Sequence, residues 1–355
     1  MSTPLLENIL NQGRALSAVR AYQFGDGRDA LEKAARLIQM KKRVVLTGMG
    51  ASMFAAMPSQ YAMAESGVHV AVCESAELLH FASTPIDHDT AVVLVSRSGE
   101  SIEVIKLIPE LEARGVVIIG VVNVPQSKLG DAADATLVLG SPADEMVAIQ
   151  TYTATLVVLR LLRDFIAGVE SRAFEDLEKL EAIVSEYAPE CMSASEQWRE
   201  FLPDNGPLYL LGRGTSLASV HEGVLLMHET AKRSAVGMSV AQFRHGPVEV
   251  VDETFRAVVF GTQPHTTELD RALVHDLNAM HGQARWIGPA PSGFGSVLIP
   301  WPASAPERFR AVLEIIPLQV LAYRWAEWRG LRPGEFRWAP LVTNAEAGFP
   351  ITTAN

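Results

Sequence analysis

Short apolar runs that alternate with helical segments are the feature that most constrains the fold of this chain. In the first half the runs lie at Val44–Leu46, Val68–Val72, Ala91–Val95, Val116–Val122 and Ala135–Leu139. Strands that are apolar on both faces are typical of a parallel sheet covered by helices. The sequence therefore predicts an α/β fold with a doubly wound parallel sheet.

The same pattern starts again in the second half, with the runs LYLLG, RAVVFGT, ARWIG and GSVLIP. LTGMGAS at Leu46–Ser52 and LLGRGTS at Leu210–Ser216 hold the same place in the two halves, which indicates two tandem copies of one fold. The charged helical stretch FEDLEKLEAIVSEYAPE is interpreted as the linker. The predicted parts are a helical segment at 1–30, a first domain at 31–175, a second domain at 195–332 and an irregular tail at 333–355.

Composition excludes several classes of protein. A net charge of −11 argues against a nucleic-acid partner, which requires a surplus of basic residues. No apolar stretch approaches the roughly 20 residues of a membrane helix, and no signal peptide is evident. Cys73 and Cys191 are the only cysteines, so neither a disulfide framework nor a cysteine metal site is supported. We expect a cytoplasmic protein that uses no metal and no cofactor.

Two strand-end loops are candidates for holding an anion. GMGAS, with Gly50 and Ser52, follows a strand and opens a helix, but the third glycine that a dinucleotide fingerprint needs is missing. SRSGES gathers three hydroxyls, those of Ser96, Ser98 and Ser101, at the end of another strand. Hydroxyls and fresh helix N–H groups suit a phosphate, while the alternative is a serine-rich helix cap.

These motifs, together with EMVAIQTYTATL, GRGTS, HEGVLLMHETA, FRHGPVEVVDE and IPLQVLAYRWAEWRG, resemble the sugar isomerase (SIS) domain family. Its members include the isomerase half of glucosamine-6-phosphate synthase and related ketosamine-phosphate deglycases and deaminases. The resemblance implies two flavodoxin-like domains and a phosphorylated sugar as substrate. It assigns the phosphate to Ser96, Arg97, Ser98 and Ser101 with help from Ser52. The family's S-T-K loop reads Met146–Gln150 here, which leaves Ala148 and Gln150 as possible contacts.

A second group of candidates lies on a predicted helix and in the turn that follows it. Glu222 and Glu229 are seven residues apart and share a helical face, whereas His228 points elsewhere and fits a solvated stripe. The resemblance implies that Glu229 is the base that moves a proton between C1 and C2. It also implies that His245, in the HGP turn, opens the sugar ring after entering from a neighbouring subunit. A homodimer is therefore expected.

Two departures from the family pattern concern the chemistry at nitrogen. Synthase members carry lysines where this chain has Leu226 and Pro340, and the sequence as printed has no glutaminase half. We expect a deglycase or deaminase that acts at C1–C2 of an amino sugar phosphate or ketose-amine 6-phosphate. One alternative is a synthase-like isomerase or aminotransferase that uses free ammonia. Another is a non-catalytic sugar-phosphate sensor, although Met1–Gly27 is too short for the usual DNA-binding region.

Overall fold

The structure is a computed structural model that describes residues 3–202 and 205–348. It contains two compact units, each assembled from two segments. The β1–β5 unit comprises Arg14–Glu178 and the chain from Glu335, and the β6–β9 unit comprises Lys179–Gly334 and the chain up to Gly13. The sequence predicts contiguous domains, whereas in the structure each end of the chain belongs to the unit formed mainly by the other half.

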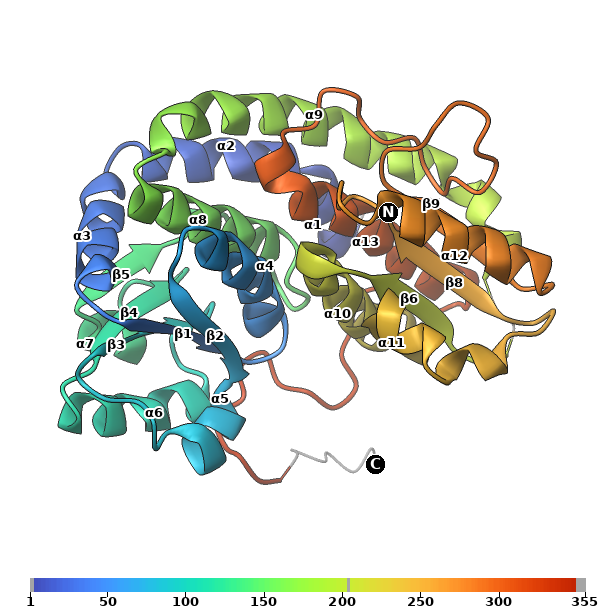
Figure 1. The fold of residues 1–355 in the computed structure, drawn as a ribbon. Helices are drawn as coiled ribbons and strands as arrows, with labels where there is room; N and C mark the ends of the chain where they lie inside the picture. Colours follow the sequence, from blue (N-terminus) through green and yellow to red (C-terminus); the bar gives the residue numbers. More distant parts are fainter. Residues whose placement is uncertain (1–2, 203–204, 349–355) are drawn as a thin grey trace. The chain divides into compact units, whose positions relative to one another are not determined.

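Five parallel strands form the sheet of the β1–β5 unit (Figure 1). They are β1 (Arg43–Gly48), β2 (His69–Glu74), β3 (Thr90–Val95), β4 (Val117–Val122) and β5 (Ala135–Val138). Their order, β2-β1-β3-β4-β5, is that of flavodoxin-like doubly wound sheets. The structure confirms the predicted parallel α/β sheet in this half.

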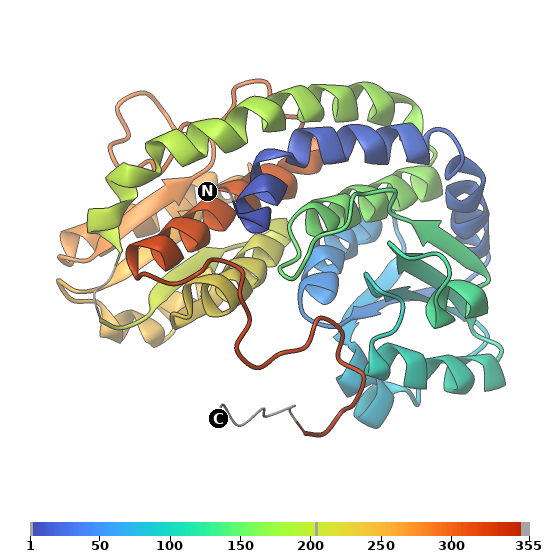
Figure 2. The same cartoon turned by 180° about the vertical axis from the view of Figure 1, so that it is seen from behind.

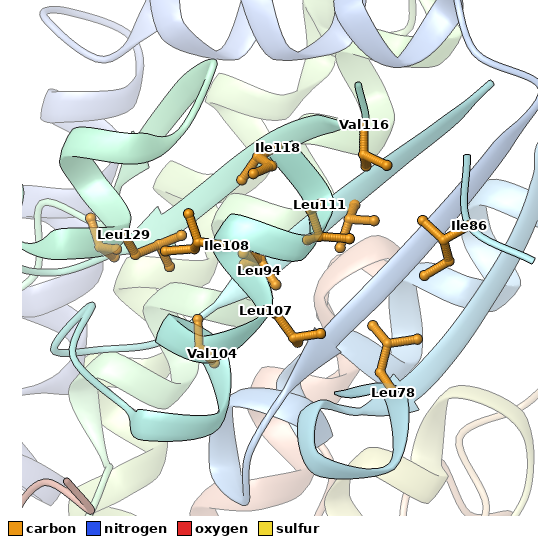
Figure 3. Packing of buried hydrophobic residues seen from close by; sticks show 12 residues of the cluster. Leu78, Ile86, Leu94, Val104, Leu107, Ile108, Leu111, Val116, Ile118 and Leu129 are labelled. Carbon is orange, nitrogen blue, oxygen red and sulfur yellow. The ribbon is translucent and has the colours of Figure 1, made fainter. Parts of the chain in front are cut away.

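Helices cover both faces of this sheet. The helical elements are α2 (Gln12–Gln23), α3 (Arg28–Gln39), α4 (Ala51–Glu65), α5 (Ser75–Glu77), a π turn η1 (Leu78–Ala82), α6 (Ile102–Ala113), α7 (Lys128–Ala132), α8 (Gln150–Ala167) and a short 3₁₀ turn η2 (Glu170–Arg172). Helices α3, α4 and α8 pack together on one face, and α6 and α7 lie on the other (Figure 1). Helix α6 buries Val104, Leu107, Ile108 and Leu111, a helical spacing that forms one apolar face against the strands (Figure 3).

The β6–β9 unit holds a second parallel sheet, in the order β7-β6-β8-β9. Its strands are β6 (Leu208–Gly212), β7 (Ala235–Ser239), β8 (Arg256–Phe260) and β9 (Gln283–Ile287). The order matches the first four positions of the other sheet. The expected strand GSVLIP is wrong: Val297 makes only an isolated bridge to Trp286, because Pro300 and Pro302 have no N–H with which to extend a ladder.

The helical elements of this unit include one that continues into the other unit. They are α1 (Pro4–Leu10), α9 (Ala173–Ala194), η3 (Ser195–Phe201), η4 (Gly214–Ser216), α10 (Leu217–Leu226), a π turn η5 (Met227–Ala231), α11 (Val240–Arg244), η6 (Pro247–Val250), α12 (Thr267–Ala279), η7 (Glu307–Phe309) and α13 (Arg310–Trp328). The charged linker stretch lies inside α9, and the boundary between the units falls within that helix.

The two ends of the chain are held by specific hydrogen bonds. At the N-terminal end, Gln12 Nε2 donates to Gln319 Oε1 at 2.7 Å, and both side chains are buried. The described part of the tail forms no helix or strand and returns to the β1–β5 unit, where Ile102 N donates to Thr343 O at 3.1 Å (Figure 2). Within 3–202 and 205–348, no helix has the length and apolarity needed to cross a membrane.

Candidate functional site

Two candidate loops leave the same edge of the sheet in the β1–β5 unit. Gly48, the last residue of β1, is the register partner of Val95, the last residue of β3. GMGAS begins at Gly48, and SRSGES follows Val95 directly. The carboxyl ends of strands in open α/β sheets are where ligands bind. The structure therefore brings the two sequence-predicted loops to one edge.

The loop after β3, residues 96–101, is here called the serine loop. Ser96 Oγ lies 3.1 Å from Ser101 Oγ and accepts from Gly99 N, also at 3.1 Å. Ser98 Oγ accepts from Glu100 N at 3.2 Å. Gly99 has φ +68° and packs so tightly that a Cβ there would lie 2.0 Å from Ser127 Oγ. The loop is thus a compact turn that gathers three hydroxyl groups.

Helix α6 begins at the end of the serine loop. Ser101 holds the N-cap position with an extended backbone, but its side chain makes no capping hydrogen bond. The structure instead pairs this hydroxyl with Ser96, so the serine-rich cap alternative does not describe Ser101. One first-turn N–H, that of Ile102, donates to the tail carbonyl of Thr343. The sequence offered no signal for this tail contact, because irregular chain carries no periodic pattern.

The GMGAS loop contributes backbone geometry and a hydroxyl. Gly50 has φ +49° and ψ −128°, a conformation that L side chains rarely adopt, and α4 starts at the next residue. Ser52 is therefore in the first turn of α4. A polar pair that the sequence reading missed lies at the same edge: Thr47 Oγ1 is 3.0 Å from Ser75 Oγ, and both residues are buried.

The segment before α8 is organised by Asp144, which sequence reasoning did not identify. Its carboxylate accepts from the N–H groups of Ile149, Gln150 and Thr151 at 3.0, 3.1 and 2.9 Å. A carboxylate at a helix N-terminus satisfies donors that a ligand would otherwise use. The main-chain N–H of Gln150 is therefore already engaged. Ala148, the other residue of this segment predicted to contact the substrate, takes no part in these hydrogen bonds.

Arg97 is directed toward that same segment. Its Nη1 donates to the carbonyl of Met146 at 3.2 Å, while its own carbonyl accepts from Asn123 N at 2.9 Å. The side chain is half-buried. Arg97 therefore links the serine loop to the loop before α8, and this restricts how its guanidinium can meet a ligand.

Glu229 lies in the β6–β9 unit on the π turn η5, which continues α10. Glu229 is half-buried. Single π turns inside α-helices occur frequently at functional sites, because they shift side chains out of the regular helical positions. Lys232 ends the turn with φ +53°, a left-handed conformation that is uncommon for a residue other than glycine, and its ammonium donates to the Glu229 carbonyl.

The neighbouring candidates are placed differently. Glu222 is only 1 % exposed, on the packed side of α10. His228 is exposed. Its Nε2 accepts a long hydrogen bond from Ala235 N at 3.4 Å. The π turn changes the expected relation between Glu222 and Glu229, since the seven-residue spacing predicts a shared face only for a regular α-helix.

His245 stands at the C-terminal end of α11 and is exposed. Gly246 follows with φ +127°, so the HGP turn depends on a conformation that favours glycine. Along the chain, β7 and α11 lie between Glu229 and His245. The imidazole of His245 is therefore accessible to solvent.

Metal binding finds no support in the part of the chain that the structure describes. No three His, Cys, Asp or Glu residues there are grouped so that they could hold a metal ion.

Comparisons with solved structures agree with this fold. The C-terminal domain of glucosamine-fructose-6-phosphate aminotransferase from Francisella tularensis superposes with a TM-score of 0.86 at 20 % identity, covering 94 % of this chain and 98 % of that one. Glucosamine-6-phosphate deaminase from Thermotoga maritima gives 0.79 at 20 % identity, covering 96 % and 99 %. At these identities the likeness shows the fold alone.

Sequence comparisons point to the same group of proteins. Isomerizing glutamine–fructose-6-phosphate aminotransferase from Pyrococcus horikoshii is 27 % identical over 336 residues, covering 93 % of this chain and 55 % of the relative. The Arabidopsis thaliana enzyme is 25 % identical over 311 residues, covering 83 % and 45 %. The chain thus spans about half the length of the curated relatives it matches. Residues 37–163 match the SIS domain, which confirms the predicted resemblance to SIS domains for this part of the chain.

Proposed function

We propose that this chain is a phosphosugar enzyme of the deglycase or deaminase type. Its substrate would be an amino sugar phosphate or a ketose-amine 6-phosphate, with the reaction at C1–C2. The observation that carries the proposal is the serine loop, in which the hydroxyls of Ser96 and Ser101 pair at the N-terminus of α6 and Ser98 lies in the same turn. Hydroxyl donors and helix N–H groups at a strand end suit a phosphate dianion.

Glu229 is proposed as the base. In the open-chain substrate the carbon that bears the amine lies next to the carbonyl group and is acidic. A carboxylate takes the proton from this carbon and returns it to the carbonyl carbon, while a proton of the amine passes to the carbonyl oxygen, and this leaves a C=N bond at the amine-bearing carbon. The bonding electrons move between C1 and C2, so no oxidant or reductant is needed. The half-buried π turn supports this role, because it gives Glu229 an environment that a regular solvated helix face would not.

The substrate is proposed to supply its own nitrogen. Leu226 and Pro340 have no amine with which to form a Schiff base. A sugar that already carries an amine next to its carbonyl group becomes an imine through the proton transfer between C1 and C2. Water then adds to the C=N carbon and the C–N bond breaks, which releases the amine and leaves a carbonyl. The protein needs only a phosphate anchor and a proton-transfer group.

His245 is proposed to open the sugar ring in a site of the neighbouring subunit of a homodimer. Ring opening moves a proton from the anomeric hydroxyl to the ring oxygen, and imidazole can both donate and accept. The exposure of His245 at the end of α11 supports this assignment.

Turnover with a panel of substrates tests the proposal. Glucosamine 6-phosphate and fructosyl-amino-acid 6-phosphates should release ammonia or a free amino acid. Fructose 6-phosphate with ammonia should turn over slowly or not at all. Tight binding of all three without turnover of any would instead establish a sensor and contradict the enzyme proposal.

A synthase-like isomerase is the second candidate, favoured by the relatives' isomerizing aminotransferase names. It needs a lysine, and Lys232 is the one whose ammonium lies beside Glu229. Borohydride reduction with each phosphosugar, followed by intact mass, separates the two candidates. A stable adduct that disappears in Lys232→Met would favour the isomerase. Turnover without any protein adduct is expected if the substrate brings its own amine.

A further inference from the structure

The loop after β6 is the counterpart of GMGAS in the β6–β9 unit. Each follows the second strand in its sheet order, and the sequences LTGMGAS and LLGRGTS correspond residue by residue. Three hydroxyls gather at this second strand end: Ser216 from η4, Ser219 from α10 and Thr262 from the loop after β8. None of the three is more than 2 % exposed.

All three hydroxyls donate to one carboxyl group, that of Glu314 in α13. Ser216 Oγ lies 2.7 Å from Oε1, Ser219 Oγ lies 2.6 Å from Oε2, and Thr262 Oγ1 also donates to Oε1. The side chain of Glu314 is completely buried. Three convergent O–H donors around a carboxylate form an arrangement that binds oxyanions.

Gln263 orients these donors. Its Nε2 donates to the hydroxyl oxygens of Thr215, Ser216 and Thr262 at 2.7, 3.1 and 3.2 Å. Because an amide donor approaches the hydroxyl oxygens of Ser216 and Thr262, their hydrogens point to another acceptor, which is Glu314. Gln263 thus holds the hydroxyls of Ser216 and Thr262 in the orientation in which they donate to Glu314.

The arginine of this loop, Arg213, pairs with Asp270 and not with Glu314. Arg213 Nε donates to Asp270 Oδ1 at 2.7 Å, and Asp270 also accepts from Thr266 at 2.9 Å. Burial raises the pKa of Glu314, while its three hydroxyl bonds and the charge of Arg310 lower it. The cradle thus consists of neutral hydroxyl donors, as the serine loop does.

We infer that this second strand-end cradle is an oxyanion site that the protein fills with its own Glu314 carboxyl group. One phosphate is then bound per chain, at the serine loop. Removing the Glu314 side chain opens a site for a small oxyanion such as phosphate or acetate. The inference depends on the proposed function only in assigning the single phosphate site to the serine loop.

Glu314→Ala tests this directly, since it removes a group with the heavy atoms of acetate. The variant is made in a Ser98→Ala/Ser101→Ala background, refolded with chloride, acetate or inorganic phosphate, and its Tm measured. We expect a lower Tm in chloride and a rise of about 5 °C with about 50 mM acetate or phosphate. Glu314→Gln, which keeps the side chain's shape, should show no such rise in the same background.

Equal anion-dependent rises in the Glu314→Ala and Glu314→Gln variants, or no rise in either, would overturn the inference. If Glu314→Ala does not fold, Glu314→Ser provides a smaller cavity for the same measurement. Isothermal titration of the unmodified chain with phosphate is the second test, and two sites per chain would also overturn the inference. Failure of phosphate to bind the unmodified chain, with rescue of Glu314→Ala intact, would count against the serine-loop assignment alone.

Discussion

The carboxyl-end edges of the two sheets carry clustered hydroxyls with different hydrogen-bond partners. In the β1–β5 unit the hydroxyls of Ser96 and Ser101 pair with each other, 3.1 Å apart. In the β6–β9 unit the hydroxyls of Ser216 and Ser219 donate to Glu314. The strand order provides a place where donors converge in both units. Whether that place is open to a ligand depends on which side chain the following helices bring to it.

The helix after each glycine loop shows a second contrast. Glu65 follows Gly48 at the same sequence spacing at which Glu229 follows Gly212. Glu65 ends the regular helix α4 and is exposed, whereas Glu229 lies on a π turn and is half-buried. Identical residues at equivalent positions therefore have different environments. Environment, more than residue type, decides whether a carboxylate serves as a base.

The largest effect is expected when Glu229 is replaced by glutamine, with the same replacement of Glu65 for comparison. Glu229→Gln should lower kcat by about two to four orders of magnitude, the usual range for a lost general base. Glu65→Gln is the matched control and should leave kcat near the wild-type value. The measurement is steady-state turnover of the best substrate from the panel.

Phosphosugar binding should survive Glu229→Gln, which calorimetry can establish. Equal losses of kcat in Glu65→Gln and Glu229→Gln would break the contrast between the two helices. A near-normal rate in Glu229→Gln would remove this residue from catalysis.

The serine loop gives the next largest effect. Ser98→Ala together with Ser101→Ala should weaken phosphosugar binding by about 100-fold, since hydrogen bonds to a charged group contribute about 1.5–3 kcal/mol each and part is recovered by water. These groups contact the phosphate in the ground state and the transition state alike, so KM should rise more than kcat falls. Thr215→Ala, in the loop after β6, should bind normally. Unchanged affinity in the double variant would move the phosphate site elsewhere.

Subunit mixing measures a smaller effect. If His245 serves the neighbouring site, a dimer of one Glu229→Gln chain and one His245→Ala chain has one site with both groups intact. Random exchange should then restore roughly a quarter of wild-type activity. Tagged subunits allow exchange to be verified independently. No recovery after verified exchange would place both residues in the site of one subunit.

The smallest effect concerns the pH dependence of stability. Burial raises the pKa of Glu314 above its ordinary value of 4.5, so the folded protein holds this proton more tightly than the unfolded chain. The stability that this group contributes is fully present below about pH 4.5 and is lost as pH rises through the folded pKa. The wild type should therefore lose stability relative to Glu314→Gln with rising pH, by at most about 1.4 kcal/mol per pH unit. A flat difference between their Tm curves would contradict this.

Much of the fold could be predicted because local signals agree with it. Apolar runs such as Ala91–Val95 are buried along their whole length, and glycines at Gly50 and Gly99 take positive φ values in strand-end loops. The repeat of LTGMGAS as LLGRGTS predicted the second sheet. In a doubly wound sheet consecutive strands alternate with helices, so a pattern read along the chain is also a pattern in space.

What sequence reasoning missed is structure that no local motif predicts, including several contacts between residues far apart in the sequence. Asp144 caps a helix from outside any capping motif, Thr343 reaches the start of α6 from the tail, and Glu314 reaches loops about fifty to a hundred residues earlier. The π turn at Glu229 is also invisible to helical periodicity, because it adds a residue to one turn without changing composition.

By itself the sequence determined the class of fold, the resemblance to SIS domains and the strand ends at which the serine and glycine loops lie. These follow from local backbone preferences and from apolar periodicity, which act over a few residues. Only the tertiary structure decided that Ser101 pairs with Ser96, that Glu229 leaves the regular helix, and that Glu314 fills the second cradle. Hydrogen-bond donors select their acceptors by distance and direction, and those are fixed only once the helices have packed on the sheets.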